Sequence, residues 1–79
     1  MKPERTYFKN GQIRTEGWKN KGGVFHRLDG PAYRWWYKNG QLGDDEWYVN
    51  GNRHRLDGPA YEAWYENGQV EYEGWYMND

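Results

Sequence analysis

The sequence contains no cysteine and no serine, and it has few aliphatic side chains. The missing cysteine excludes a disulfide framework, a thiolate metal site and a thiol nucleophile. Thr6 and Thr15 supply the only aliphatic hydroxyl groups, and neither has a histidine near it in the sequence. We therefore do not expect covalent catalysis by a hydroxyl or a thiol.

Long apolar runs are missing as well. No segment approaches the roughly 18 consecutive apolar residues that indicate a membrane span. The first residues, Met1 to Glu4, do not resemble a signal peptide. From these two features we expect a cytoplasmic protein that makes no contact with a membrane.

The apolar residues that are present are mostly aromatic. Apolar side chains make up 35% of the 79 residues, and aromatic side chains make up 20%. A domain of this size buries only about 60% of the surface of its unfolded chain. We therefore expect its packing to depend on aromatic rings, each of which can bury about 150–250 Å².

Internal repetition predicts how the chain is organised. The segment His26–Tyr33 (HRLDGPAY) returns as His54–Tyr61, a shift of 28 residues. A partial copy near the start, beginning at Tyr7, is displaced by 29 residues. Such self-similarity is typical of repeat proteins. We predict a single domain over residues 1–79, with a partial repeat 1–25, a repeat 26–53 and a repeat 54–79.

Each repeat is predicted to form β-hairpins. Asn-Gly between segments of alternating polarity favours a two-residue type I′ turn, because both central residues need a positive φ. This dipeptide occurs at Asn10-Gly11, Asn39-Gly40, Asn50-Gly51 and Asn67-Gly68. No segment favours a helix, so the predicted fold is all-β: an antiparallel meander of five to eight short strands in one twisted sheet.

The predicted turn at residues 39–40 sets a register for the central hairpin. It places Arg34 opposite Asp45 and Trp36 opposite Gly43. Because side chains alternate between the faces of a sheet, the repeated small and large residues share one face, which we interpret as the structural face. Its members are Ala32, Trp36, Trp47, Ala60, Trp64 and Trp75. The opposite face carries Tyr33, Trp35 and Tyr37.

The repeat resembles a known family. Trp-Tyr-x-Asn-Gly-Gln, followed by Trp-Tyr and a further Asn-Gly, resembles MORN-type repeats over residues 7–78. More closely, the chain is similar to the variant with the signature His-Arg-x-Asp-Gly-Pro-Ala, which is common in phage, bacterial and giant-virus proteins. The resemblance implies a β-hairpin array that acts as a protein- or lipid-binding scaffold without catalysis.

The repeated His-Arg-Leu-Asp segments have two interpretations. A metal site would require His26 and Asp29 to meet His54 and Asp57. We favour a structural turn, in which the aspartate caps backbone N–H groups of glycine and the histidine packs on a tryptophan. Other carboxylates fall on strands with no pocket implied. The sequence thus predicts no metal site, no cofactor, no catalytic residue and no enzymatic activity.

Positions that differ between repeats point to a binding surface. The shift that relates the repeats converts the Arg34–Asp45 pair into Glu62–Glu73, and two like charges opposite each other are unfavourable. This clash predicts a basic group over Glu62 and Glu73.

Trp35 has no counterpart in the other repeats and lies beside Tyr33 and Tyr37. An unmatched tryptophan among tyrosines is typical of a binding hot spot. The alternative is an ordinary packing residue.

The net charge of −1 conceals a division along the chain. Residues 1–40 hold nine basic and three acidic side chains, a net charge of +6, whereas residues 41–79 hold two basic and nine acidic ones, a net charge of −7. Three interpretations compete: edge-to-edge self-association, recognition of a basic protein, and binding of nucleic acid by the basic half. The last is disfavoured by a pI near 6.1.

We therefore predict a small, non-catalytic protein that acts by protein–protein interaction, with homo-oligomerisation as a further prediction. The resemblance suggests that it is a phage-encoded inhibitor of a host defence protein, acting in the host cytoplasm. The alternative is an oligomeric sponge that stacks a nucleotide-like or sugar ligand on Trp and Tyr rings and binds its anionic group with arginine. The predicted binding residues are Arg27, Tyr33, Arg34, Trp35, Tyr37, Arg55, Glu62 and Glu73.

Overall fold

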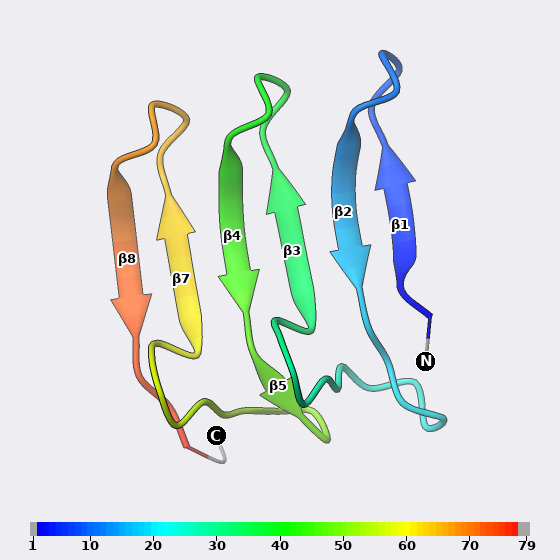
Figure 1. Ribbon diagram of the computed structural model, residues 1–79, viewed down its shortest axis with the longest axis vertical. Coiled ribbons are helices and arrows are strands. Elements are labelled where there is room, and N and C mark those ends of the chain that lie inside the picture. The colour runs from blue at the N-terminus through cyan, green and yellow to red at the C-terminus, as the bar shows by residue number, and fades with distance from the viewer. Residues whose placement is uncertain (1, 78–79) are drawn as a thin grey trace.

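Three β-hairpins stand side by side in a single antiparallel sheet (Figure 1). The computed structural model describes residues 2–77. The main sheet has six strands in the order β1-β2-β3-β4-β7-β8, and β5 and β6 form a separate two-stranded ribbon. The strands are β1 (Glu4–Tyr7), β2 (Ile13–Gly17), β3 (Tyr33–Trp36), β4 (Leu42–Glu46), β5 (Tyr48–Val49), β6 (Asn52–Arg53), β7 (Tyr61–Trp64) and β8 (Val70–Gly74).

The predicted all-β hairpin meander is confirmed. The described residues form strands, turns and bends without a helix, so they include no helix that could cross a membrane. The molecule measures 34 × 28 × 15 Å, and its short dimension is that of one sheet with its side chains. Both faces of the main sheet are therefore outer surfaces.

The Asn-Gly turns are of two kinds, and the type I′ prediction is right for one of the four. Asn50 and Gly51 both have positive φ, at 51° and 85°, and join β5 to β6 as a two-residue loop. At the other three sites only the glycine has a positive φ. There the asparagine side chain accepts a backbone N–H two residues further on, for example Asn39 Oδ1 from Gln41 N at 2.9 Å.

These three turns are therefore longer than predicted. In the central hairpin, the Tyr37 N–H donates to the Gln41 carbonyl, which leaves a three-residue loop that ends in the left-handed Gly40. Such loops combine a type I turn with a glycine in the left-handed region. The extra residue moves the register by one near the turn, so Trp36 lies opposite Leu42 and not opposite Gly43 as predicted.

A β-bulge then restores the predicted register. Its extra residue is Gly43 on β4, which falls between the partners of Trp35 and Trp36, and equivalent bulges occur in the other two hairpins. Beyond the bulge, Arg34 lies opposite Asp45, as predicted. The two errors cancel because a three-residue loop and a bulge each shift the pairing by one residue.

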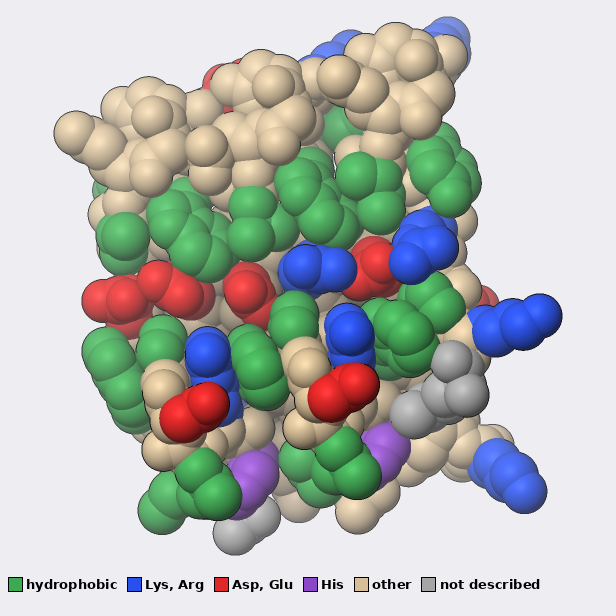
Figure 2. All heavy atoms as spheres, viewed as in Figure 1, with side chains coloured by type: hydrophobic (Ala, Val, Ile, Leu, Met, Phe, Trp, Pro, Cys, Tyr) green, Lys and Arg blue, Asp and Glu red, His purple; other side chains and the backbone are tan. Residues whose placement is uncertain are grey.

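The register defines two faces. We call the first the charged face, because a row of ionisable side chains crosses it from β1 to β8: Arg5, Glu16, Arg34, Asp45, Glu62 and Glu73. Figure 2 shows this row as a band of acidic and basic groups between two belts of apolar side chains. We call the other the tyrosine face; its adjacent rows include Tyr33, Trp35, Asp44, Glu46, Tyr61, Ala63 and Tyr72.

The apolar interior is small and consists of alanine. Ala32 and Ala60 are fully buried, and Ala63 is nearly so; no large side chain in residues 2–77 is completely buried. The predicted structural face is thus correct for Ala32 and Ala60, whereas Ala63 is buried on the opposite face. The prediction is wrong for Trp75, which is 65% exposed. Half-buried aromatic rings on both faces, together with the backbone ladders, hold the sheet together.

Candidate functional site

In the N-terminal half of the charged row, two arginines flank one glutamate and pair with it. Glu16 is buried and accepts bonds from Arg5 Nε at 2.9 Å and from Arg34 Nη2 at 2.6 Å. Burial alone would raise the pKa of Glu16, but the hydrogen bonds and charges of the two arginines outweigh it and hold the pKa below its ordinary value. Two basic groups therefore share one carboxylate across β1, β2 and β3.

The C-terminal half of the row is acidic, and within the row only Asp45 lies opposite an arginine, Arg34. Asp45 lies opposite Glu62, and Glu62 lies opposite Glu73, so the predicted like-charge pair is present. Burial raises the pKa of Asp45, against the charges of Arg34 and Arg55. Burial, and then the hydrogen bond and charge of Glu73, raise the pKa of Glu62. Three neighbouring carboxylates thus favour the approach of a cation.

Below the row, each His-Arg-Leu-Asp-Gly-Pro-Ala segment forms what we call a latch. The Arg27 guanidinium lies 4.3 Å from the Trp18 ring centroid, donates from Nε to Asp29 at 3.0 Å and donates from Nη1 to the Pro31 carbonyl at 3.2 Å. A Cβ on Gly30 would come within 2.7 Å of the guanidinium carbon, so only glycine leaves room for it.

The second latch repeats the first. Arg55 stacks on Trp47 at 4.0 Å and bonds to Asp57 and to the Pro59 carbonyl at 3.0 and 3.1 Å. A Cβ on Gly58 would again lie 2.7 Å from the guanidinium carbon. The signature is thus explained as a device that seats an arginine on the tryptophan of the preceding hairpin.

The turn interpretation of these segments holds, but its predicted aspartate contact is wrong. Each aspartate bonds to the arginine two residues earlier instead of capping a glycine N–H. The His26 ring accepts the Asn50 N–H through Nδ1 at 3.0 Å, and the backbone N–H of His26 donates to the Trp18 carbonyl at 2.9 Å. Within residues 2–77, no three His, Asp or Glu side chains gather in a metal-binding arrangement.

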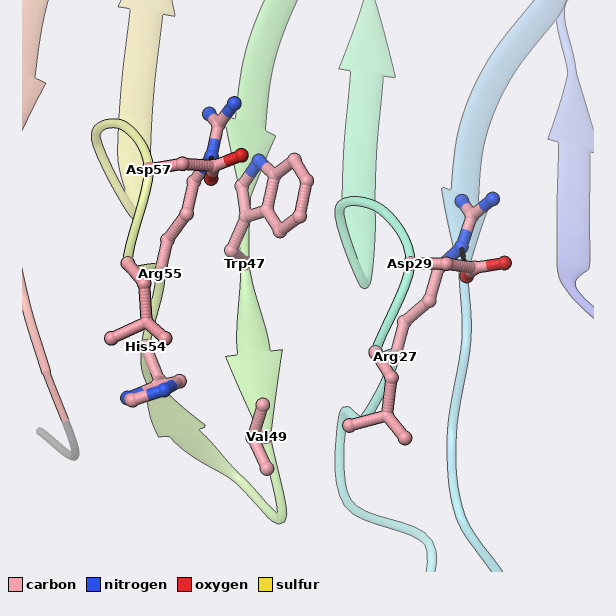
Figure 3. Close-up of a pocket in the computed structure, with 9 residues that line it drawn as sticks. Arg27, Asp29, Trp47, Val49, His54, Arg55 and Asp57 are labelled. Carbon is pink, nitrogen blue, oxygen red and sulfur yellow. Dashed lines mark hydrogen bonds and ion pairs between the residues drawn. The ribbon is translucent and has the colours of Figure 1, made fainter.

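A groove lies between the two latches (Figure 3). Its volume is about 570 Å³, within the range of about 300–1,000 Å³ that ligand sites occupy. Trp47 and Val49 line its floor, and the side chains of Leu28 and Leu56, which are 76% and 79% exposed, stand beside it. This pair of exposed leucines recurs with the repeat and was not singled out from the sequence.

The predicted binding residues do not form one surface. Arg34, Glu62 and Glu73 lie in the charged row, and Arg27 and Arg55 lie in the latches on the same side of the molecule. The three aromatic members lie on the tyrosine face, where they make packing contacts. The Tyr33 ring lies tilted against the Phe25 ring at 5.3 Å between centroids, and the Tyr37 hydroxyl donates to the Trp64 carbonyl at 2.9 Å.

The tryptophan at position 35 occurs together with a second difference between the repeats, at the residue that its ring covers. Its ring covers Gly43, where an added Cβ would fall 2.6 Å from Cη2, and it meets Tyr37 edge-on at 5.0 Å. In the next repeat the equivalent pair is Ala63 and Glu71. A large residue with a glycine therefore replaces a small residue with a side chain, which favours the packing interpretation of Trp35; its role in binding stays a prediction.

Asp44 is a buried acid that sequence reasoning missed. It is 5% exposed, lies between Trp35 and Ala63 in the register, and its Oδ1 has no hydrogen-bond partner among the described residues. Burial, followed by the hydrogen bond and charge of Glu46, raises its pKa to about 8. The alternation of the strand gave only its face, because its burial depends on the ring of Trp35.

Comparison with known proteins gives no assignment: no family model, no curated protein and no solved structure matches the chain.

The latch leads to a prediction about stability. Arg55→Lys keeps the charge but loses the planar stack on Trp47 and the paired donors to Asp57 and Pro59, so it should lower the free energy of unfolding by about 1–2 kcal/mol. Urea unfolding followed by circular dichroism measures the loss. Arg14→Lys, at an exposed position, is the matched control and should change it by less than about 0.5 kcal/mol. Equal stability of both variants would show that the latch contributes nothing.

Proposed function

We propose that this protein is a non-catalytic repeat domain that binds a basic segment of a partner protein on its charged face. An apolar side chain of the partner enters the groove between the latches, and its Lys or Arg side chains lie over the acidic end of the row. The observation that carries the proposal is the juxtaposition, on one face, of an apolar groove with three neighbouring carboxylates, of which only Asp45 lies opposite an arginine.

The groove supplies the apolar part of the interaction. Leu28 and Leu56 expose most of their surface, although apolar side chains of this size gain about 1.5–3 kcal/mol on burial. They stand on either side of a floor that includes Trp47. Because the stacked and paired arginines keep the latches rigid, the partner would meet a preformed surface, which reduces the entropic cost of binding.

The acidic end of the row supplies selectivity for a basic partner. Asp45 is two residues before Trp47 in the chain, and the charge of Arg55 lowers the pKa of its carboxyl group. The carboxylates therefore adjoin the groove. A cation placed over Asp45 and Glu62 would relieve their mutual repulsion. Such charge complementarity acts mainly on specificity and on the rate of association.

The geometry gives less support to a stacking ligand held by Arg27 and Arg55. Each guanidinium already covers a tryptophan ring and is paired with an aspartate. A nucleotide or sugar would have to displace these contacts before it could use either the arginine or the ring. A protein segment can use the exposed leucines with the latches intact.

Peptide selection tests the proposal. Peptides are selected from a random displayed library on the wild-type protein, without any selection against a variant. We expect the selected sequences to share one large apolar residue flanked by Lys or Arg. Leu56→Asp should weaken their binding, measured by fluorescence anisotropy, by about tenfold or more, which corresponds to about 1.4 kcal/mol.

The matched control places the same charge elsewhere. Val24 is an exposed apolar residue outside the groove, so Val24→Asp should leave the affinity unchanged within about twofold. Selected peptides without basic residues, or equal affinity for wild type and Leu56→Asp, would contradict the proposal.

A further inference from the structure

Neighbouring hairpins pair in the same way at the two places where they meet, which we call joints. At the first joint, β2 pairs with β3, and Glu16 lies opposite Arg34. At the second joint, β4 pairs with β7, and Asp45 lies opposite Glu62. The shifts of 29 and 28 residues that relate the repeats carry Glu16 to Asp45 to Glu73. The outer edge of β8 thus presents the acidic residue that a further joint would use.

The opposite edge presents the matching basic residue. The same shifts relate Arg5 on β1 to Arg34 and Glu62. All four residues of β1 are exposed, and among the described residues β1 pairs only with β2 and β8 only with β7. Unpaired edge strands of this kind are templates for pairing with another chain.

From this geometry we infer that two copies of the protein join head to tail, the β8 edge of one copy pairing antiparallel with the β1 edge of the next. The register is that of the two joints within the chain. It places Glu73 opposite Arg5 of the second copy, and Tyr72 opposite Thr6 of the second copy.

The charges favour this joint between copies over the second joint within the chain, where Asp45 lies opposite Glu62. Glu73 opposite Arg5 reproduces the acid–base pairing of Glu16 and Arg34, whose atoms approach to 2.6 Å. In the assembly Arg5 lies between two carboxylates, Glu73 of one copy and Glu16 of its own, as Arg34 lies between Glu16 and Asp45. A cation next to Glu73 also relieves the clash with Glu62.

The contact is heterologous, because it joins two different edges. A joined pair keeps one free β1 edge and one free β8 edge, so the assembly closes as a ring or continues as a filament. Because edge charges are exposed, high salt should weaken the contact. The proposed function and this inference share Glu73, which belongs to the acidic end of the row and to the β8 edge. Leu56→Asp tests the groove alone and Arg5→Glu tests the joint alone, so failure of one is distinguishable from failure of the other.

Charge reversal at the two edges tests the inference. Sedimentation velocity at low salt should show wild-type protein associating as its concentration rises, and high salt should reverse the association. Glu73→Arg sets two arginines against each other at the joint, and Arg5→Glu sets two glutamates against each other. Each variant alone should therefore raise the dissociation constant by about tenfold or more. An equimolar mixture of the two should associate again, because every joint between unlike variants then holds one acidic and one basic residue.

A control variant makes the same charge change on β8 but outside the predicted contact. Glu71→Arg makes the same charge change on the same exposed strand, but at the bulge, and should associate like wild type. Circular dichroism establishes that each variant is folded. Monomeric wild-type protein at all concentrations, association of Glu73→Arg equal to wild type, or a mixture that fails to associate would overturn the inference.

Discussion

Gly43→Glu should destabilise the protein unless Trp35 is replaced at the same time. The Trp35 ring occupies the space above Gly43, so any side chain there must push the ring away. Overpacking of this kind costs about 1–3 kcal/mol. Trp35→Ala alone should cost about 2 kcal/mol, less than the roughly 3–5 kcal/mol of a fully buried aromatic residue, because Trp35 is half-buried. Both losses are measured by urea unfolding with circular dichroism detection.

The double variant tests whether the two losses of stability have one cause, the packing of the Trp35 ring on Gly43. Trp35→Ala with Gly43→Glu copies the pair that the next hairpin carries, Ala63 with Glu71. We expect it to be no less stable than Trp35→Ala alone, a coupling energy of about 1–3 kcal/mol. If the losses in the free energy of unfolding simply add, Trp35 does not pack on Gly43. That result would favour the hypothesis of a binding hot spot at Trp35.

Asp44→Asn should make the protein more stable above neutral pH. Burial and the Glu46 carboxylate raise the pKa of Asp44 to about 8, whereas an aspartate in the unfolded chain titrates near about 3.9. Between these values the folded state binds the extra proton, so the free energy of unfolding falls as the pH rises from about 4 to 8. Asparagine resembles the protonated acid and should gain about 1–3 kcal/mol at a pH of about 8.5.

Thermal unfolding across this range checks the effect. Wild-type protein should lose stability progressively as the pH rises, and Asp44→Asn should lose markedly less. The two proteins should converge near a pH of about 4, where both side chains are neutral in the folded state. Glu66→Gln, at an exposed turn position, is the control and should follow the wild-type curve. Parallel curves for wild type and Asp44→Asn would show that Asp44 titrates normally.

The sequence predicts the repeats and the charged pairs within two of the hairpins because both depend on the regularity of the repeat, whereas the row across all six strands emerges only from the pairing between hairpins. Arg34 opposite Asp45 and Glu62 opposite Glu73 are correct although the turn at residues 39–40 is not, since the bulge compensates for the longer loop. The loop type could not be read from Asn-Gly alone. An asparagine side chain that bonds to the backbone holds its residue out of the left-handed region, and this competes with a type I′ turn.

The contacts that depend on tertiary packing were not predictable. Arg27 and Arg55 occupy the same position in the two repeats. Only the fold places each of them on the tryptophan of the preceding hairpin. The relation of Trp35 to Gly43 requires the bulge, which has no strong local signal. The groove between Leu28 and Leu56 joins two segments 28 residues apart, so only the stacking of repeats creates it.

The central claim, a binding site for a basic protein segment on the charged face, is tested most directly by NMR. A selected peptide is titrated into ¹⁵N-labelled protein, and its effects are mapped on the backbone amides and on the indole N–H groups. We predict the largest shifts at Leu28, Leu56, Glu62 and the Trp47 indole, with Tyr33 and Tyr61 on the opposite face unmoved. Shifts confined to the tyrosine face would contradict the account.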